Sequence, residues 1–447
     1  MFEAALAGGA NVYEHEELIK VFLRPSEYRI SVSGEGFTGK GESMRRLYGE
    51  LSRHTGKAPE WGILTGVRPV KLAGELHDRL GGAEAVRKAL TEEYLLSGEK
   101  ADLLLSVLRR QRSALGKPAR GSGCLYIGIP FCPTRCLYCS FTSNKAEEPM
   151  MSGYMEALLK EMAYAGAEVR KSGMRLESVY IGGGTPTALP EAHFSRLLDG
   201  VTGHFDLTAA REFSVEAGRP DTITSGKLSA IKGAGVTRIS INPQSMHGRT
   251  LEHIGRMHTR ESVAEAFSAA REAGMNSINM DVIAGLPGEG PEDFAETLRQ
   301  VVGMGPENIT VHTLAVKRAS RLMEMDSGYH YGQGDAVREM LQGCGKSLAG
   351  AGYAPYYLYR QKHMAGGLEN VGWCREGAEG VYNVRIMEEA QTVVALGAGG
   401  ISKVFFPDEN RHERVPNVSD CGQYVSRIDE MIARKREKLF TEERERC

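Results

Sequence analysis

The sequence has no long apolar run, no large excess of charge and no start that resembles a leader. No stretch approaches the roughly 20 apolar residues that a membrane-spanning helix needs. The net charge is -2, so nothing favours nucleic acid or another polyanion as a partner. Residues 1–23 carry Glu14, Glu16, Glu17 and Lys20 instead of a basic segment followed by an apolar core, so we expect no signal peptide. These absences predict a cytoplasmic protein without a membrane span.

Three of the eight cysteines lie close together, and no second pair is present to complete a four-ligand site. Cys132, Cys136 and Cys139 fall in one short loop directly after the apolar run 124–129, which is typical of a buried strand. A structural zinc site usually takes four ligands as two separated pairs. An odd number of thiols in a reducing compartment disfavours disulfides. The pattern favours an iron–sulfur cluster with cysteine on three irons and the fourth iron open.

The cysteine spacing, in a loop that follows a strand, resembles the radical S-adenosylmethionine (SAM) superfamily. In that superfamily Cys-x3-Cys-x2-Cys binds the cluster, and the open iron chelates the amino and carboxylate groups of SAM. The resemblance implies that Cys132, Cys136 and Cys139 are the metal ligands, and that a [4Fe-4S] cluster and SAM are the cofactors. The alternative is three unrelated buried cysteines.

From residue 124 onward, short apolar runs alternate with amphipathic helical stretches. We expect strands at 124–129, 178–181, 212–216, 238–242, 277–283 and 308–314, and helices at 152–171, 191–202, 222–233, 260–273 and 291–302. Such β/α repeats imply a parallel sheet with helices outside it and sites at the carboxyl ends of the strands. The expected fold class is α/β, a partial (β/α)6 barrel of the radical-SAM type with an N-terminal α+β domain and a small C-terminal cap.

The expected domains are residues 1–120, 121–320 and 321–447. The N-terminal domain has a strand pattern at 28–33 and helical spacing at 42–54 and 83–115, with a turn at 66–71 between them. Arg68 and Lys71 in that turn could bind an anion, but an exposed turn with solvated charges is more common. In the cap, four tyrosines around Pro355 are expected to pack in the core or to cover a flat ligand, and 426–440 is expected to be a solvated charged helix.

Polar residues cluster where the expected strands end. The second strand is followed by Gly182-Gly183-Gly184-Thr185-Pro186-Thr187, where residues without side chains let backbone groups approach a ligand. Glu216 ends the third strand, Gln244 and Arg256 follow the fourth, and Asp281 lies in the fifth. Each alone is explained by a turn or a surface contact. Together they are what a ribose, a carboxylate and an adenine require.

These residues narrow the resemblance, from about Tyr126 to Leu314, to the oxygen-independent coproporphyrinogen III oxidase (coproporphyrinogen dehydrogenase) family and its heme-trafficking relatives. The spacing from Gln244 through Arg256 to Asp281 agrees with that family. The resemblance implies that the cofactor-binding residues are Tyr126, Gly183, Gly184, Thr185, Glu216, Gln244, Arg256 and Asp281.

Two departures bear on the branch of this family. The classical oxidases have a fourth cysteine where this chain has Phe141, as the heme-trafficking members do. Those members also carry His-Asn-x-x-Tyr ahead of a glycine-rich turn, whereas this chain has Glu369-Asn370-Val371-Gly372-Trp373. The combination is most similar to the oxidase-like proteins of Gram-positive bacteria.

The resemblance implies that the reduced cluster cleaves SAM to methionine and a 5′-deoxyadenosyl radical, which abstracts hydrogen from a propionate of coproporphyrinogen III. Loss of carbon dioxide and an electron then leaves a vinyl group, and two such reactions give protoporphyrinogen IX. The implied partners are the tetrapyrrole and a reducing electron donor such as flavodoxin or ferredoxin. A heme-binding trafficking protein remains the alternative, and a radical-SAM enzyme with another substrate is a third possibility.

A substrate with four propionates needs fixed cations, and arginine pairs with carboxylates through two parallel hydrogen bonds. Arg219 lies just past the end of the third strand, and we expect it to bind substrate. Arg318 and Arg321, just past the sixth strand, are further candidates. A solvated arginine is the more common alternative at each position.

Overall fold

The computed structural model of the chain describes residues 1–33, 39–141, 144–145 and 147–441. Within these residues, eleven strands form one mixed sheet in the order β11-β12-β10-β9-β8-β7-β6-β3-β13-β14-β15. The six central strands are parallel and lie at the predicted positions. They are β3 (Ser122–Ile129), β6 (Arg175–Gly183), β7 (Glu212–Glu216), β8 (Arg238–Ser240), β9 (Ile278–Ala284) and β10 (Asn308–Thr313).

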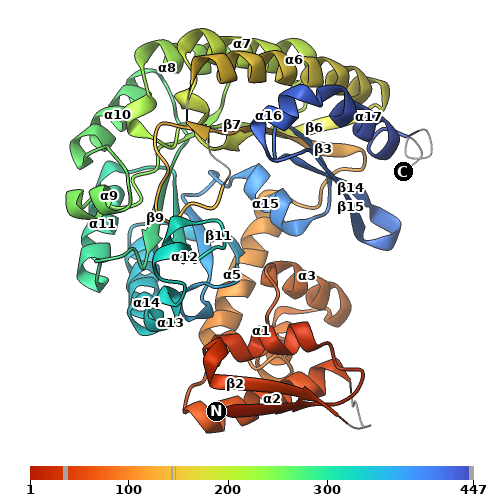
Figure 1. Cartoon of the computed structure of the whole chain (residues 1–447), viewed down its shortest axis with the longest axis vertical. Coiled ribbons are helices and arrows are strands. Elements are labelled where there is room, and N and C mark those ends of the chain that lie inside the picture. The colour runs from red at the N-terminus through yellow and green to blue at the C-terminus, as the bar shows by residue number, and fades with distance from the viewer. Residues whose placement is uncertain (34–38, 142–143, 146, 442–447) are drawn as a thin grey trace.

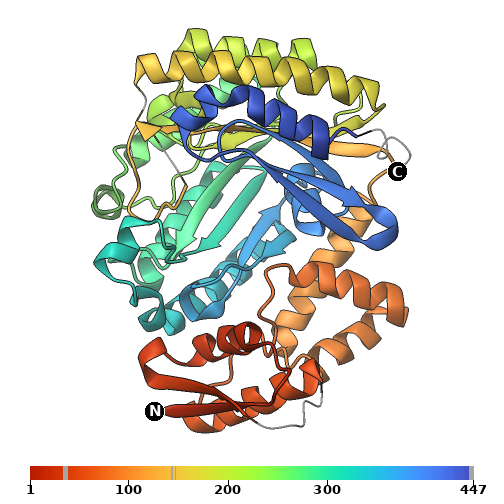
Figure 2. The ribbon, with the colours of Figure 1, turned by 45° about the vertical axis from the view of Figure 1, so that its right-hand side comes forward.

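Helices connect these strands and cover the outer face of the curved sheet (Figure 1, Figure 2). They are α6 (Glu148–Lys171), α7 (Glu191–His204), α8 (Ser225–Gly233), α10 (Arg260–Glu272) and α11 (Pro291–Met304). In α10 the buried residues Val263, Ala266, Phe267 and Ala270 recur at helical spacing, and Thr259 caps the first turn by accepting from the backbone N–H of Ser262. None of the helices in the described ranges is long and apolar enough to cross a membrane.

The N-terminal part begins with two parallel strands, β1 (Phe2–Leu6) and β2 (Tyr28–Val32), which share a core with α1 (Val12–Phe22) and α2 (Lys40–Thr55). The helical spacing at 83–115 resolves into α4 (Ala83–Glu92) and α5 (Gly98–Ala114), because Ser97 caps a new helix. The turn predicted at 66–71 is shorter than expected. Pro69 starts α3 (Pro69–Leu80), since proline suits the first helical position, so Lys71 is helical.

We expected the C-terminal part to form a small cap domain, and this division stays a prediction. In the structure its strands extend the sheet at both ends. At one end β12 (Asn370–Cys374) pairs with β10, and β11 (Ala354–Tyr359) pairs with β12. At the other end β13 (Thr392–Leu396) pairs with β3 and is followed by β14 (Ile401–Phe406) and β15 (Arg411–Pro416). The helices of this part other than α15 are α12 (Arg321–Met325), α13 (Tyr329–Gly332), α14 (Gly334–Gly350), α16 (Cys421–Ser426) and α17 (Ile428–Lys438).

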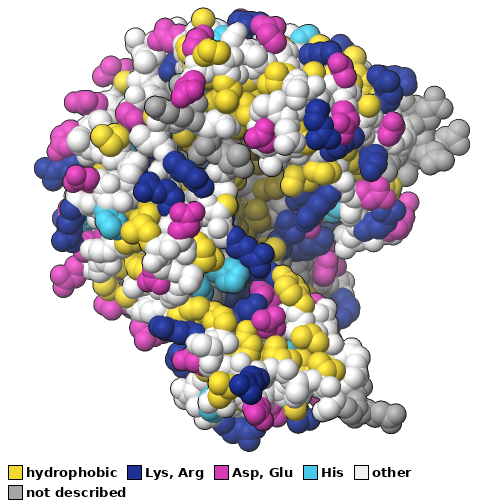
Figure 3. Space-filling view, in the orientation of Figure 1, with side chains coloured by type: hydrophobic (Ala, Val, Ile, Leu, Met, Phe, Trp, Pro, Cys, Tyr) yellow, Lys and Arg dark blue, Asp and Glu magenta, His cyan; other side chains and the backbone are white. Residues whose placement is uncertain are grey.

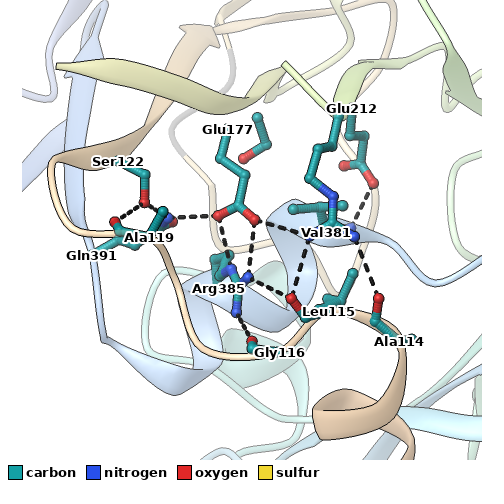
Figure 4. Close-up of polar contacts among 12 residues, drawn as sticks. Ala114, Leu115, Gly116, Ala119, Ser122, Glu177, Glu212, Val381, Arg385 and Gln391 are labelled. Carbon is teal, nitrogen blue, oxygen red and sulfur yellow. Dashed lines mark hydrogen bonds and ion pairs between the residues drawn. The ribbon is translucent and has the colours of Figure 1, made fainter. Parts of the chain in front are cut away.

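One further helix, α15 (Val381–Glu388), lies inside the curved sheet (Figure 1). Its Arg385 donates from Nη2 to Oε1 of Glu177 at 2.9 Å, and Gln391 donates to the other oxygen of the same carboxylate at 2.6 Å. Glu212 accepts a hydrogen bond of 2.7 Å from the backbone N–H of Val381. Figure 4 shows this network at the amino-terminal ends of β3, β6 and β7. It fixes α15 across the interior of the barrel.

The terminal helix α17 is charged, but one of its faces is buried, which corrects the expectation of a solvated helix. Lys435 is fully buried and pairs with Glu161 of α6, Nζ to Oε1, at 2.7 Å. It also donates to the side chain of Asn417 at 2.6 Å. A charge-rich sequence conceals such a contact, because the pairing carboxylate is more than 250 residues away.

Candidate functional site

The cysteine loop leaves β3 and is held between two distant segments. The backbone N–H of Leu137 donates to Ile254 at 2.9 Å, just after the short helix α9 (Gly248–His253), and the N–H of Leu322 donates to Leu137 at 3.0 Å. Cys132, Cys136 and Cys139 all line one cavity of about 390 Å³. The structure therefore brings the three predicted metal ligands to a common space at the carboxyl end of the sheet.

The three thiols suit a cluster better than a single ion. Within the described ranges, no group of three His, Cys, Asp or Glu side chains is arranged to hold one metal ion, whereas a cluster takes each cysteine on a different iron. Burial raises the pKa of Cys132 to about 11, although a hydrogen bond with the Thr185 hydroxyl partly offsets this, and burial also raises the pKa of Cys139. A bound cluster must therefore displace protons from these thiols.

Arg219, predicted to bind substrate, lies beneath the cysteine loop. Its guanidinium donates to the Thr134 hydroxyl at 3.0 Å, pairs with Asp221 at 3.2 Å and lies 3.9 Å from the sulfur of Cys136. Only 2% of the residue is exposed. Arg219 lines the cavity, so its substrate role stays a prediction, but its contacts favour a role in holding the cluster loop. Arg318 and Arg321 are exposed and do not line the cavity.

The glycine segment at the end of β6 forms a cradle that side chains would fill. Gly183 has φ of 107°, a conformation that favours glycine. A Cβ on Gly184 would lie 2.6 Å from the carbonyl oxygen of Phe131, and one on Gly182 would lie 2.9 Å from the carboxyl carbon of Glu216. Gly183, Gly184 and Thr185 line the cavity, and their contact with a ligand stays a prediction.

The four polar residues predicted at successive strand ends also face this cavity: Glu216, Gln244, Arg256 and Asp281. Two buried side-chain atoms among them have no hydrogen-bond partner among the residues that the structure describes, Oε1 of Gln244 and Nε of Arg256. Gln244 has φ of 65°, which is rare for a residue other than glycine. Unpaired buried polar atoms and a strained backbone at a cavity wall are features that a polar ligand resolves.

The two carboxylates at the rim have different environments. Burial raises the pKa of Glu216 to about 7, despite a hydrogen bond from the Tyr180 hydroxyl. Burial acts in the same sense on Asp281, but His312, 3.5 Å away, and Asn279 outweigh it and hold the pKa of Asp281 below its usual value. The cavity thus presents one carboxyl that titrates near neutrality beside one that stays ionised.

Tyr126 is the predicted cofactor residue that does not line the cavity. Its ring stacks on Tyr180, with ring centroids 6.3 Å apart, and on Tyr382 of α15 at the same distance. Its hydroxyl lies near Gly183. Its role as a SAM contact stays a prediction.

Sequence reasoning missed several cavity residues. Tyr180 and His312 precede the ends of β6 and β10, and alternation along those strands could have placed them on the inner face. Among the tyrosines around Pro355, Tyr356 is fully buried, whereas Tyr357 and Tyr359 line the cavity. That they cover a flat ligand stays a prediction. The donor set as a whole fits the implied cofactors: three thiols for the cluster, and a glycine cradle with unpaired polar atoms for SAM.

The fold and this arrangement at one edge of the sheet define a radical SAM protein. A family model described as the radical SAM superfamily matches residues 126–301. The chain is 39% identical over 387 residues to the oxygen-independent coproporphyrinogen-III oxidase-like protein HemZ of Bacillus subtilis, covering 85% of this chain and 77% of that protein. It is 30% identical over 294 residues to the heme chaperone HemW of Escherichia coli, covering 64% of this chain and 71% of that protein.

Among solved structures, the coproporphyrinogen III oxidase HemN of Escherichia coli matches with a TM-score of 0.58 over 72% of each chain at 23% identity, which supports the fold. The chain therefore belongs to the radical SAM superfamily and, within it, to the oxygen-independent coproporphyrinogen III oxidase-like family. Its cofactors are a [4Fe-4S] cluster and SAM. Relatives carry both oxidase and chaperone names, so family membership alone does not fix the activity.

Proposed function

We propose that the chain is an oxygen-independent coproporphyrinogen III dehydrogenase, which converts two propionates of coproporphyrinogen III to vinyl groups and gives protoporphyrinogen IX. The observation that carries this proposal is the composition of the cavity. Besides the cofactor residues, aromatic and cationic side chains line the same cavity, among them Tyr357, Tyr359 and Lys317. A flat molecule with carboxylates at its edge suits a cavity lined in this way.

The chain's own residues bind and orient in this reaction. When bound, the cluster and SAM supply the radical that removes a hydrogen atom from the substrate. Cys132, Cys136 and Cys139 hold the cluster. Glu216 and Asp281 hold polar groups of SAM. The rings of Tyr357 and Tyr359 exclude water from the reacting carbon. No side chain has to act as a general base, because the hydrogen leaves as an atom.

The reaction needs electrons from outside the chain, and we propose a reducing donor such as flavodoxin or ferredoxin. We place the protein in the cytoplasm, where a reducing environment keeps the three cluster thiols free of disulfides.

The second candidate function is heme trafficking, which the similarity to the chaperone HemW and the presence of Phe141 in place of a fourth cysteine favour. Against it, Glu369 occupies the position of the trafficking histidine. Its carboxylate accepts from the indole N–H of Trp61 at 2.8 Å and from Lys100 at 2.6 Å. These contacts support a structural task for Glu369, namely tying the N-terminal part to the barrel.

One experiment separates the two functions. The reconstituted protein is incubated without oxygen with SAM, dithionite and coproporphyrinogen III, and the porphyrins are separated by chromatography after oxidation. A product that has lost two carboxyl groups is expected. Stable heme binding without any vinyl product would overturn the proposal in favour of trafficking.

A further inference from the structure

Four cations gather around a single carboxylate at the end of α15. Glu389 lies 2.9 Å from Arg68 Nη1, 3.1 Å from Lys403 Nζ and 4.0 Å from Lys71 Nζ. Arg414 lies directly opposite Lys403 on the neighbouring strand. We call Arg68, Lys71, Lys403 and Arg414 the cationic cluster. Two of its members come from the start of α3, and two from the β14–β15 hairpin.

The cluster holds more positive charge than the fold neutralises. Lys403 and Arg414 are like charges in directly opposed positions, which destabilises a sheet. The guanidinium of Arg414 makes no ion pair within the ranges that the structure describes, and the buried Nε of Arg68 has no hydrogen-bond partner. Burial lowers the pKa of both Arg68 and Lys403, and the charge of Arg414 lowers them further.

The purely structural explanation is that the cations neutralise Glu389 and the negative end of α15. Each end of a helix carries about half an elementary charge. The positive end of α3, at Arg68, therefore offsets the negative end of α15. One carboxylate against four cations then leaves a surplus of about three charges. Glu389 itself has φ of 50°. A surplus built from two segments that are far apart in the sequence points to an external anion.

The cationic cluster lies next to the cavity of the cofactor site. Asn383, Ile386 and Met387 of α15 line that cavity, and Glu389 follows Met387 by two residues, or about 3 Å of helix rise. A second connection runs through β11: the N–H of Arg360 donates to Val67 at 2.8 Å, and the neighbours of Arg360, Tyr359 and Gln361, line the cavity.

The hairpin presents its cations to the interior of the barrel. Lys403 pairs with Val393 of β13, which packs with Cys124 and Tyr382 on the inner face of the sheet. The ring of Phe405 lies on the same face, 4.9 Å from the ring of His412. In Figure 3, Lys and Arg side chains gather beside the central hollow, where α3 faces the β14–β15 hairpin.

We propose that the cationic cluster is a subsite that binds carboxylates of the tetrapyrrole substrate, and this inference rests on the proposed dehydrogenase function. A cavity of about 390 Å³ is at the small end of ligand sites, and the cluster and SAM occupy part of it. Most of a tetrapyrrole must therefore extend along α15. Propionates on its far edge then meet Arg68, Lys71, Lys403 and Arg414, while a propionate on the near edge faces SAM.

The test compares two probes on reconstituted protein, coproporphyrin III and its tetramethyl ester, by fluorescence titration. Arg414→Gln and Lys71→Gln should each weaken binding of the free acid about tenfold or more, because each removes a charge-assisted hydrogen bond. Binding of the ester should not change. The matched control is Arg411→Gln, on the same strand but the other face, where Arg411 pairs with Glu409 and Glu413. It should bind both probes as the unchanged protein does.

Iron content and the thermal midpoint show whether each variant is folded. In Arg414→Gln and Lys71→Gln the KM for coproporphyrinogen should rise with little change in kcat. Equal affinity for the free acid in all four proteins would overturn the subsite and leave the dehydrogenase proposal standing. Parallel loss of acid and ester binding would also overturn it, since the cations would then act through the fold. If the unchanged protein binds neither probe and forms no vinyl product, the proposed function itself fails.

Discussion

Two groups of polar residues lie at opposite ends of the central sheet, and they differ in how completely their hydrogen bonds are satisfied. At the amino-terminal ends, the carboxylate of Glu177 receives hydrogen bonds from Arg385 and Gln391, and Glu212 receives one from Val381 (Figure 4). At the carboxyl ends, Gln244 and Arg256 keep buried atoms that have no partner within the described part of the chain. Both groups are buried and charged, so burial alone does not distinguish them.

This difference in hydrogen bonding distinguishes residues that stabilise the fold from residues that bind a ligand. A buried network whose members satisfy one another stabilises one arrangement of the chain. A buried group with unpaired atoms costs stability, and such groups are retained where a ligand completes them. Removing residues from the amino-terminal network should therefore destabilise the fold, whereas removing residues from the carboxyl-terminal cavity should weaken ligand binding and leave the fold intact.

The largest effect is expected at the cysteines. Replacing any one of Cys132, Cys136 or Cys139 by Ala should abolish the absorbance of the cluster and most of the bound iron, because no further cysteine among the described residues lines the cavity. Cys344→Ala is the control, since Cys344 is buried in the core away from the cavity. Iron analysis and visible spectra of anaerobically reconstituted proteins decide it. Full iron retention in the three variants would exclude this loop as the cluster site.

The amino-terminal network is tested by Arg385→Ala. Removing Arg385 leaves the half-exposed Arg211, 3.2 Å away, as the remaining cation beside Glu177 among the described residues. The loss of the buried partner should lower the free energy of unfolding by about 3 kcal/mol, the low end for a broken buried ion pair. The measurement is urea denaturation, with Arg411→Ala as a control in an exposed ion pair that should show no measurable change. SAM affinity of the folded Arg385→Ala protein should stay within about threefold. A selective loss of SAM binding would mean that the network serves the site directly.

The sequence predicted the barrel well because its signals are local. Each central strand is a short apolar run, and each connecting helix has its own periodicity and cap, as at Thr259. It did not predict how the C-terminal strands pair, because β13 joins β3 through contacts about 270 residues apart. Nor did it place α15 inside the sheet, since Arg385 finds Glu177 only in the folded chain.

The sequence predicts the candidate site well where a residue type at a given spacing has one usual chemical role. The three cysteines and the glycine segment satisfy this condition, and the structure brings them to one cavity. Single charged residues do not satisfy it: Arg219 lines the cavity, but it also pairs with Asp221, so its predicted substrate role stays a prediction. The cationic cluster has a signal in the sequence only at Arg68 and Lys71, and the hairpin that completes it is more than 300 residues away.

The carboxyl-terminal cavity is tested by Asp281→Asn. Asp281 is ionised and faces the cavity, so removal of its charge should weaken SAM binding by about 1.5–3 kcal/mol, or roughly 10- to 150-fold. Iron content should not change. Titration calorimetry measures the affinity, and Glu324→Gln on the exposed face of α12 is the control. Unchanged affinity in Asp281→Asn would show that SAM lies elsewhere in the cavity.

The smallest expected effect concerns Glu216, the rim carboxyl whose pKa burial raises from 4.5 to about 7. Between these two values the folded chain holds a proton that the unfolded chain has released, so stability falls as the pH rises through this window. The amide of Glu216→Gln stays uncharged over this pH range, so the variant lacks this pH dependence. The difference in unfolding free energy between the unchanged protein and Glu216→Gln should therefore shift by about 1–2 kcal/mol against the unchanged protein between pH 5 and pH 8.

Urea denaturation at the two pH values, without SAM, measures this shift, and Glu324→Gln should follow the unchanged protein at both. SAM carries positive charge, which favours the ionised form of Glu216. The affinity of the unchanged protein for SAM should therefore rise as the pH passes through about 7. In Glu216→Gln that rise should be absent. If the stability difference is the same at both pH values, Glu216 is already ionised in the ligand-free chain, and the cavity is less desolvated than its unpaired atoms indicate.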